Sequence, residues 1–220
     1  MKFEAILFDC DGVLVDSEPI VNTVLREMLA ERGWVMTARE CMQFFVGKAV
    51  RDERVAIEAH TGQPLTEDWM NLFYARRNRE LDARLEIMAG AHAAVQAAHS
   101  YTRQRIACAS GADRAKVEMQ LLKVGLMDFF AGNIFSGQEM ARSKPAPDVY
   151  LAAARHLDAP AHQCLVIEDT TVGTTAGVAA GATVWAYCPL PEQGPTLLQA
   201  GASRLFGHMA ELPQLLLEAA

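Results

Sequence analysis

The sequence predicts an α/β protein built around a parallel β-sheet. Short apolar runs alternate with segments of helical periodicity over most of the 220 residues, which is typical of strands joined by covering helices. One block, residues 17–88, breaks this alternation and contains helical patterns alone. We therefore expect two domains: a core formed by residues 1–16 and 89–220, and an inserted helical-bundle cap domain formed by residues 17–88.

Four apolar runs are the expected strands of the core. Each is short and followed by polar or turn-forming residues; the four are Phe3–Phe8, Gln104–Ala109, Gln163–Ile167 and Ala182–Tyr187. Helical patterns lie between or after them, at Ala91–Ser100, Asp113–Val124, Asp148–Leu157 and Thr171–Ala180. Right-handed crossovers between parallel strands make this a doubly wound, Rossmann-like sheet. A short edge strand near Arg204–Phe206 and a terminal helix are expected after it.

The inserted block carries the start and stop signals of several helices. Pro19 suits a first helical turn, and Thr37 with Glu40 forms a capping-box pattern. Thr66 is a suitable N-cap for a long helix. The expected helices are Ile20–Arg32, Cys41–Phe45, Arg51–His60 and a fourth from Thr66 through Leu85. A helical block inserted after the first strand is typical of a lid over a binding site.

Composition and charge limit the classes of partner. Lys plus Arg number 20 and Asp plus Glu number 27, which gives a net charge of −7. Because binding to a nucleic-acid backbone needs clustered cations, we expect no nucleic-acid partner. We expect a cytoplasmic protein without a membrane partner. The five cysteines include no C-x-x-C pair, and the sequence shows neither a cleavable leader pattern nor an apolar stretch of membrane-spanning length. A monomer is the default expectation.

Polar residues stand at the ends of three expected strands. Asp9 and Asp11 follow the first strand, Ser110 the second, and Glu168 and Asp169 the third. Ligands bind beyond the carboxyl ends of the strands in an open parallel sheet, so we expect these side chains to meet at one edge. Clustered carboxylates repel one another unless they hold a hard cation, and carboxylate and carbonyl oxygens suit Mg²⁺.

A lysine and two hydrogen-bond donors complete the expected site. Lys144 lies in a proline-rich segment that restricts the backbone, and its ammonium group would neutralise nearby carboxylates. The Ser110 hydroxyl and the Gly111 N–H could donate to a phosphoryl group near a helix N-terminus. Singly, each residue is also explained as a turn former, a helix cap or a solvated side chain, and Glu168 equally as a structural carboxylate. These separate explanations do not account for the acids, the serine and the lysine all standing in their places along one α/β pattern.

The residues resemble the motifs of the haloacid dehalogenase superfamily, which contains aspartate-nucleophile phosphatases and phosphomutases. The motifs stand here as Asp9-Cys10-Asp11-Gly12-Val13, Ser110, Lys144 in Lys-Pro-Ala-Pro-Asp, and Glu168-Asp169-Thr170, and the resemblance covers about residues 3–188. The helical insert is similar to the cap of the subgroup that contains beta-phosphoglucomutase and phosphoglycolate phosphatase. The stretch from Phe135 to Pro145 is most similar to sugar-phosphate phosphatases of the 6-phosphogluconate type.

This resemblance implies a role for each motif residue. Asp9 would attack the phosphorus and form an aspartyl-phosphate, and Asp11 would act as general acid and then as general base. Mg²⁺ would be held by the side chains of Asp9 and Asp169 and the backbone carbonyl of Asp11, with Glu168 close by. The transferred phosphoryl group would be bound by Ser110, Gly111 and Lys144. The implied enzyme is a Mg²⁺-dependent phosphatase of a small phosphorylated metabolite, such as a sugar or sugar-acid phosphate.

The cap domain is expected to select the substrate. Its candidate substrate contacts are Glu18, Gly47, Lys48, Arg51 and Arg76, with Arg77 and Arg79 as further candidates for a second anion. Glu18 is similar to the substrate-proximal acid of the family. For each arginine on the fourth helix, a solvated helix face is the simpler explanation.

Two alternatives to the phosphatase hypothesis remain. The first is a sugar-phosphate mutase of the beta-phosphoglucomutase type; mutases of this subgroup carry a His where this chain has Val21, and the Arg of their cap loop comes one residue earlier after its Gly than Arg51 does here. The second is a non-catalytic binding protein on the same fold. Such a protein would be expected to have lost at least one of four residues that are all present: Asp9, Asp11, Lys144 and Asp169.

Overall fold

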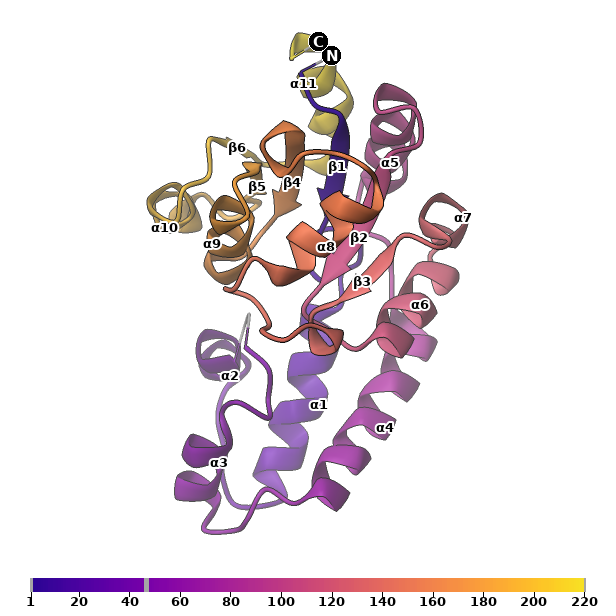
Figure 1. Cartoon of the computed structure of the whole chain (residues 1–220). Helices are drawn as coiled ribbons and strands as arrows, with labels where there is room; N and C mark the ends of the chain where they lie inside the picture. The colour runs from indigo at the N-terminus through magenta and orange to yellow at the C-terminus, as the bar shows by residue number, and fades with distance from the viewer. Residues whose placement is uncertain (1, 46–47, 220) are drawn as a thin grey trace. The chain divides into compact units, whose positions relative to one another are not determined.

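The structure, a computed structural model, describes residues 2–45 and 48–219. The chain divides into two compact units, Met1–Asp16 with Glu86–Ala220 and Ser17–Leu85, and Figure 1 colours them along the sequence. The helical unit thus ends at Leu85, where the sequence analysis placed the boundary at residue 88. No described helix is long and apolar enough to span a membrane.

The first unit is built on a parallel sheet. Within the described residues the sheet has six strands in the order β3-β2-β1-β4-β5-β6, and neighbouring strands pair in parallel. The strands are β1 (Ala5–Phe8), β2 (Ile106–Ser110), β3 (Ile134–Ser136), β4 (Cys164–Glu168), β5 (Thr183–Tyr187) and β6 (Arg204–Phe206). The expected α/β fold class is confirmed. Strand β3 was not predicted, whereas β6, which is equally short, was expected near Arg204–Phe206.

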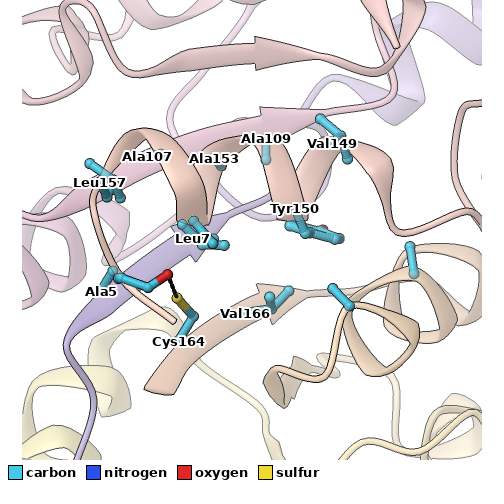
Figure 2. Packing of buried hydrophobic residues seen from close by; sticks show 14 of the residues in the cluster. Ala5, Leu7, Ala107, Ala109, Val149, Tyr150, Ala153, Leu157, Cys164 and Val166 are labelled. Atoms are coloured by element: carbon cyan, nitrogen blue, oxygen red, sulfur yellow. Dashed lines mark hydrogen bonds between the residues drawn. The ribbon is translucent and has the colours of Figure 1, made fainter. Parts of the chain in front are cut away.

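Helices cover both faces of the sheet. On one face Tyr150 and Ala153 of α8 (Asp148–His156) and Ala176 of α9 (Thr171–Ala179) pack with Leu7 and Val166 in one apolar cluster, part of which Figure 2 shows. On the other face Phe8 meets Phe130 edge to face, with ring centroids 6.0 Å apart. The remaining helices are α5 (Ala91–Tyr101), α6 (Arg114–Lys123), α7 (Met127–Phe130), α10 (Gly194–Gln199) and α11 (Leu212–Glu218), with short 3₁₀ turns η1 (Gly137–Glu139), η2 (Ala161–Gln163), η3 (Pro191–Gln193) and η4 (Met209–Glu211).

The described residues of the second unit form helices joined by turns and irregular segments. Its helices are α1 (Glu18–Ala30), α2 (Ala38–Phe45), α3 (Arg54–Thr61) and α4 (Glu67–Arg84). The predicted capping box is confirmed, because Thr37 N–H donates to Glu40 at 2.7 Å and Glu40 N–H donates to Thr37 Oγ1 at 3.2 Å. Thr66 caps α4 by accepting from the Trp69 N–H at 3.2 Å. The predicted start of the third helix at Arg51 is wrong, because residues 50–53 form turns and the helix begins at Arg54.

Candidate active site

The ends of β1, β2 and β4 carry buried polar side chains. Asp9 directly follows β1, and its backbone N–H donates to the Ile167 carbonyl of β4 at 2.9 Å. Ser110 is the last residue of β2 and Glu168 the last of β4. All three side chains are buried, although buried polar groups are costly unless they find partners. Their partners therefore define the site.

Lys144 joins the ends of β1 and β4. Its Nζ lies 2.6 Å from Asp9 Oδ1 and 2.7 Å from Glu168 Oε1, and 4.7 Å above the centre of the Tyr150 ring. Its side chain is 8% exposed, so the lysine is part of the interior rather than a solvated surface group. Because an unpaired buried ammonium is very costly, the two carboxylates are what holds it there.

Glu168 accepts hydrogen bonds on both carboxylate oxygens. Oε1 accepts from Lys144 Nζ and from the Tyr150 hydroxyl at 2.9 Å. Oε2 accepts from the backbone N–H groups of Asp169 at 3.0 Å and Thr170 at 3.1 Å, and from the Thr170 hydroxyl at 3.0 Å. A carboxylate with five donors is rigidly oriented. Through Oε1, Glu168 holds the Lys144 ammonium group beside Asp9.

Three carboxylates are close enough to share a metal ion. One carboxylate oxygen from each of Asp9, Glu168 and Asp169 lies within 4.8 Å of the others. Two glycines make room for them. Gly12 has φ +79°, and a Cβ there would collide with Asp169 Oδ2, while a Cβ on Gly173 would collide with the Glu168 carboxylate. The all-oxygen donor set and this cleared space fit Mg²⁺.

The pKa values of the three central groups shift in different directions. Burial raises the pKa of Asp9 to about 7, with Lys144 opposing and the charges of Glu168 and Asp11 adding to the rise. Burial lowers the pKa of Lys144, but the charges of Asp9 and Glu168 outweigh it and hold that pKa well above its usual range. Burial also raises the pKa of Glu168, yet Lys144 outweighs it and the result is a lowered pKa. The charges of Lys144 and Glu168 therefore cancel, and the three groups become net negative only as the pH rises through the Asp9 pKa of about 7.

The loop after β2 offers a hydroxyl and open backbone. Ser110 Oγ accepts from the Ala112 N–H at 3.1 Å, and a Cβ on Gly111 would meet no atom within 4 Å. Ser136 Oγ of β3 donates to the Ala112 carbonyl at 2.6 Å and so ties this loop to the neighbouring strand. An anion placed over Gly111 would find space and nearby N–H groups.

The Asp11 carboxylate lies apart from the other three. Lys116 Nζ donates to both of its oxygens at 2.8 Å, and Gln120 Nε2 donates to Oδ1 at 2.8 Å. Both donors belong to α6. Asp11 is therefore held toward this helix, and the metal-compatible group among the described residues does not include its side chain.

Comparison with known proteins places the chain in a family. The model of the haloacid dehalogenase-like hydrolases matches residues 3–181. The chain belongs to the haloacid dehalogenase-like hydrolase family. The resemblance that the motifs predicted is thus confirmed.

Among its relatives, 6-phosphogluconate phosphatase from Escherichia coli is 27% identical over 97% of this chain and 95% of that protein. A phosphoglycolate phosphatase from Cupriavidus necator is 29% identical, covering 96% of this chain and 92% of that protein. A haloacid dehalogenase family hydrolase from Deinococcus radiodurans, solved with bound phosphate and sodium, is 31% identical with a TM-score of 0.79 over 99% of this chain and 96% of that chain. These matches support the expected enzyme class, a phosphoric monoester hydrolase.

The basic residues that were expected to contact the substrate form ion pairs with acidic residues of the helical unit itself. Lys48 lies 3.3 Å from Glu53, and Arg51 donates to both carboxylate oxygens of Glu67. Arg76 pairs with Glu31, which directly follows α1. Glu18 is the first residue of α1, and Gly47 lies outside the described residues. Their expected contacts with a substrate stay predictions.

Sequence reasoning missed three residues that contact the motif residues: Tyr150, Lys116 and Gln120. Tyr150 is a buried member of the apolar cluster under the sheet, and nothing in its spacing sets it apart from other core residues. Lys116 and Gln120 did carry a signal. They stand four residues apart on a helix whose other buried positions, Val117 and Leu121, are apolar. Polar residues on the buried face of a helix indicate buried partners.

Proposed function

We propose that this hydrolase is a Mg²⁺-dependent phosphatase that cleaves a small phosphate monoester, a sugar or sugar-acid phosphate, through an aspartyl-phosphate on Asp9. The observation that carries the proposal is the position of Lys144. Its ammonium group contacts Asp9 and Glu168 at 2.6 and 2.7 Å, inside a group of three carboxylates that fits a metal ion. One cation among several buried carboxylates is suited to binding a phosphoryl group rather than to stabilising the fold.

In the first step an Asp9 oxygen attacks the phosphorus in line, and the bond from phosphorus to the leaving oxygen breaks. Asp11 gives its proton to that leaving oxygen. The phosphoryl oxygens are held by the Lys144 ammonium, the Ser110 hydroxyl and the Gly111 N–H, which oppose the charge that spreads over them.

In the second step Asp11 takes a proton from a water molecule as the water attacks the same phosphorus. The bond between phosphorus and the Asp9 oxygen breaks, phosphate leaves, and Asp9 is restored. Each step returns the proton that the other uses, so one acid–base residue serves both. A dehalogenase would not need it, because a halide leaves without a proton.

The metal would be held by the Asp9 and Asp169 side chains and by the Asp11 backbone carbonyl. Glu168 lies close by, but its oxygens already accept from five donors, so its role is to orient Lys144. When bound, Mg²⁺ supplies positive charge that favours the ionised form of Asp9 and offsets the charge of the phosphoryl group.

The substrate class rests on the relatives, one of which is named for 6-phosphogluconate and another for phosphoglycolate. Substrate selection by the helical unit, residues 17–85, is part of the proposal. The mutase alternative is less favoured, because the position at which such mutases carry a His is Val21, which packs against the apolar cluster of the helical unit.

The test is phosphate release from a panel of sugar phosphates, sugar-acid phosphates, phosphoglycolate and p-nitrophenyl phosphate, with Mg²⁺ or with EDTA. We expect release that needs the metal and is abolished in Asp9→Asn, and the best substrate names the class. The exposed Asp158→Asn is the matched control and should behave as the wild type. Release only after addition of a sugar bisphosphate would favour a mutase, and no release at all would overturn the proposal.

A further inference from the structure

The side chain of Asp11 is held by two neighbouring residues of one helix. Lys116 contacts both carboxylate oxygens and Gln120 contacts one of them, each at 2.8 Å. The two residues stand one turn apart on α6, so they lie on the same face. α6 follows the Ser110-Gly111 loop, and the helix that holds Asp11 is therefore anchored beside the proposed phosphoryl site.

Packing alone does not explain these two residues. The Lys116 side chain is 7% exposed and Gln120 is fully buried. The other buried residues of α6, Val117 and Leu121, are apolar. Buried ion pairs seldom stabilise a fold more than apolar residues of the same size would. A lysine and a glutamine at these positions therefore stabilise the fold less than apolar residues would. This cost indicates that their contact with Asp11 serves a purpose other than stability.

Both holding side chains are fixed by further contacts. Gln120 Oε1 accepts from the Cys10 thiol at 3.6 Å, which leaves its Nε2 directed at Asp11. Lys116 lies in the first turn of α6, where its backbone N–H donates to the Asp113 side chain at 2.9 Å. The helix start and the glutamine amide thus have one defined orientation toward the carboxylate.

We propose, building on the proposed function, that Lys116 and Gln120 are positioning residues that hold the Asp11 carboxylate in a resting position, which it must leave to act on the leaving oxygen. Lys116 occupies both carboxylate oxygens and Gln120 one of them, so Asp11 reaches a leaving oxygen only by giving up these contacts. The acid step therefore carries the cost of breaking the contact.

Two substrates of similar shape separate this role from a structural one. Phenyl phosphate needs a proton on its leaving oxygen, whereas p-nitrophenyl phosphate hardly does, because nitrophenolate is a good leaving group. The readout is the ratio of kcat/KM for phenyl phosphate to kcat/KM for p-nitrophenyl phosphate. A fold defect lowers both values together, whereas a change at Asp11 moves their ratio.

We expect the ratio to rise by about tenfold in Lys116→Met, equivalent to about 1.4 kcal/mol, and by less in Gln120→Leu, which retains the ion pair. Lys116→Arg, which keeps the charge and the donors, and Lys123→Met, an exposed lysine on the same helix, should keep the wild-type ratio. An unchanged or lowered ratio in both Lys116→Met and Gln120→Leu would overturn the resting position. Asp11→Asn is the reference: if it leaves the ratio unchanged, the proposed acid role of Asp11 fails instead.

Discussion

Replacing the proposed nucleophile should make the metal-free protein more stable at alkaline pH. Burial raises the pKa of Asp9 from 3.8 to about 7, so the folded protein resists the ionisation that the unfolded chain undergoes freely. Below pH 3.8 both states hold the proton and Asp9 costs nothing. As the pH rises to about 7 the unfolded state loses the proton first, so stability falls across that window and stays reduced above it.

The size of the effect follows from the two pKa values. Their difference, about 3, corresponds to about 4 kcal/mol once Asp9 is fully ionised. An asparagine has the same shape and carries no charge at any pH. Asp9→Asn should therefore exceed the wild type by about 4 kcal/mol near pH 8.5, and by about 2 kcal/mol near pH 5.

The assay is urea denaturation in EDTA at several pH values, followed by circular dichroism. Asp158→Asn is the control, since Asp158 is exposed and its positive φ of 50° is one that asparagine also adopts readily. Added Mg²⁺ should stabilise the wild type and not Asp9→Asn. The reasoning is refuted if Asp9→Asn is no more stable than the wild type near pH 8.5, or if the gap does not shrink as the pH falls.

Three further changes test single contacts. Tyr150→Phe removes one donor from Glu168 and should cost about 1.5–3 kcal/mol in urea denaturation, with no loss if that hydrogen bond is absent. Gly12→Ala places a Cβ against Asp169 at a positive φ, so Mg²⁺ should raise the melting temperature far less than in the wild type; an equal rise would contradict the cleared metal site. Thr66→Ala removes the N-cap of α4 and should cost about 1 kcal/mol without changing kcat, and a large kcat loss would show that the cap does more than start the helix.

The sheet could be predicted from sequence because its strands are buried on both faces. Apolar runs such as Phe3–Phe8 stand out from the helical patterns around them, and the polar residues after each run mark its carboxyl end. The short strand β3 was not predicted, and α3 begins later than expected because the turns before it carry helix-compatible residues.

The candidate site was only partly predictable for a different reason. Motif spacing indicates that Asp9, Lys144 and Glu168 meet, but it does not say which side-chain rotamer each adopts. The position of Asp11 depends on Lys116 and Gln120 of α6, more than a hundred positions away. Their place on the buried face of the helix indicates a buried partner, but it does not say that the partner is Asp11. Ion pairs such as Arg51 with Glu67 likewise depend on how two helices pack.

The central claim is that Asp9 carries the phosphoryl group, and trapping that group tests it most directly. The enzyme would be quenched with acid during turnover of p-nitrophenyl phosphate with Mg²⁺, and its peptides analysed by mass spectrometry. The account predicts a phosphoryl group on the peptide that contains Asp9, lost after treatment with hydroxylamine and absent from Asp9→Asn, which is also inactive. An Asp9→Asn protein that still releases phosphate at the wild-type rate, or a phosphoryl group on another residue, would contradict it.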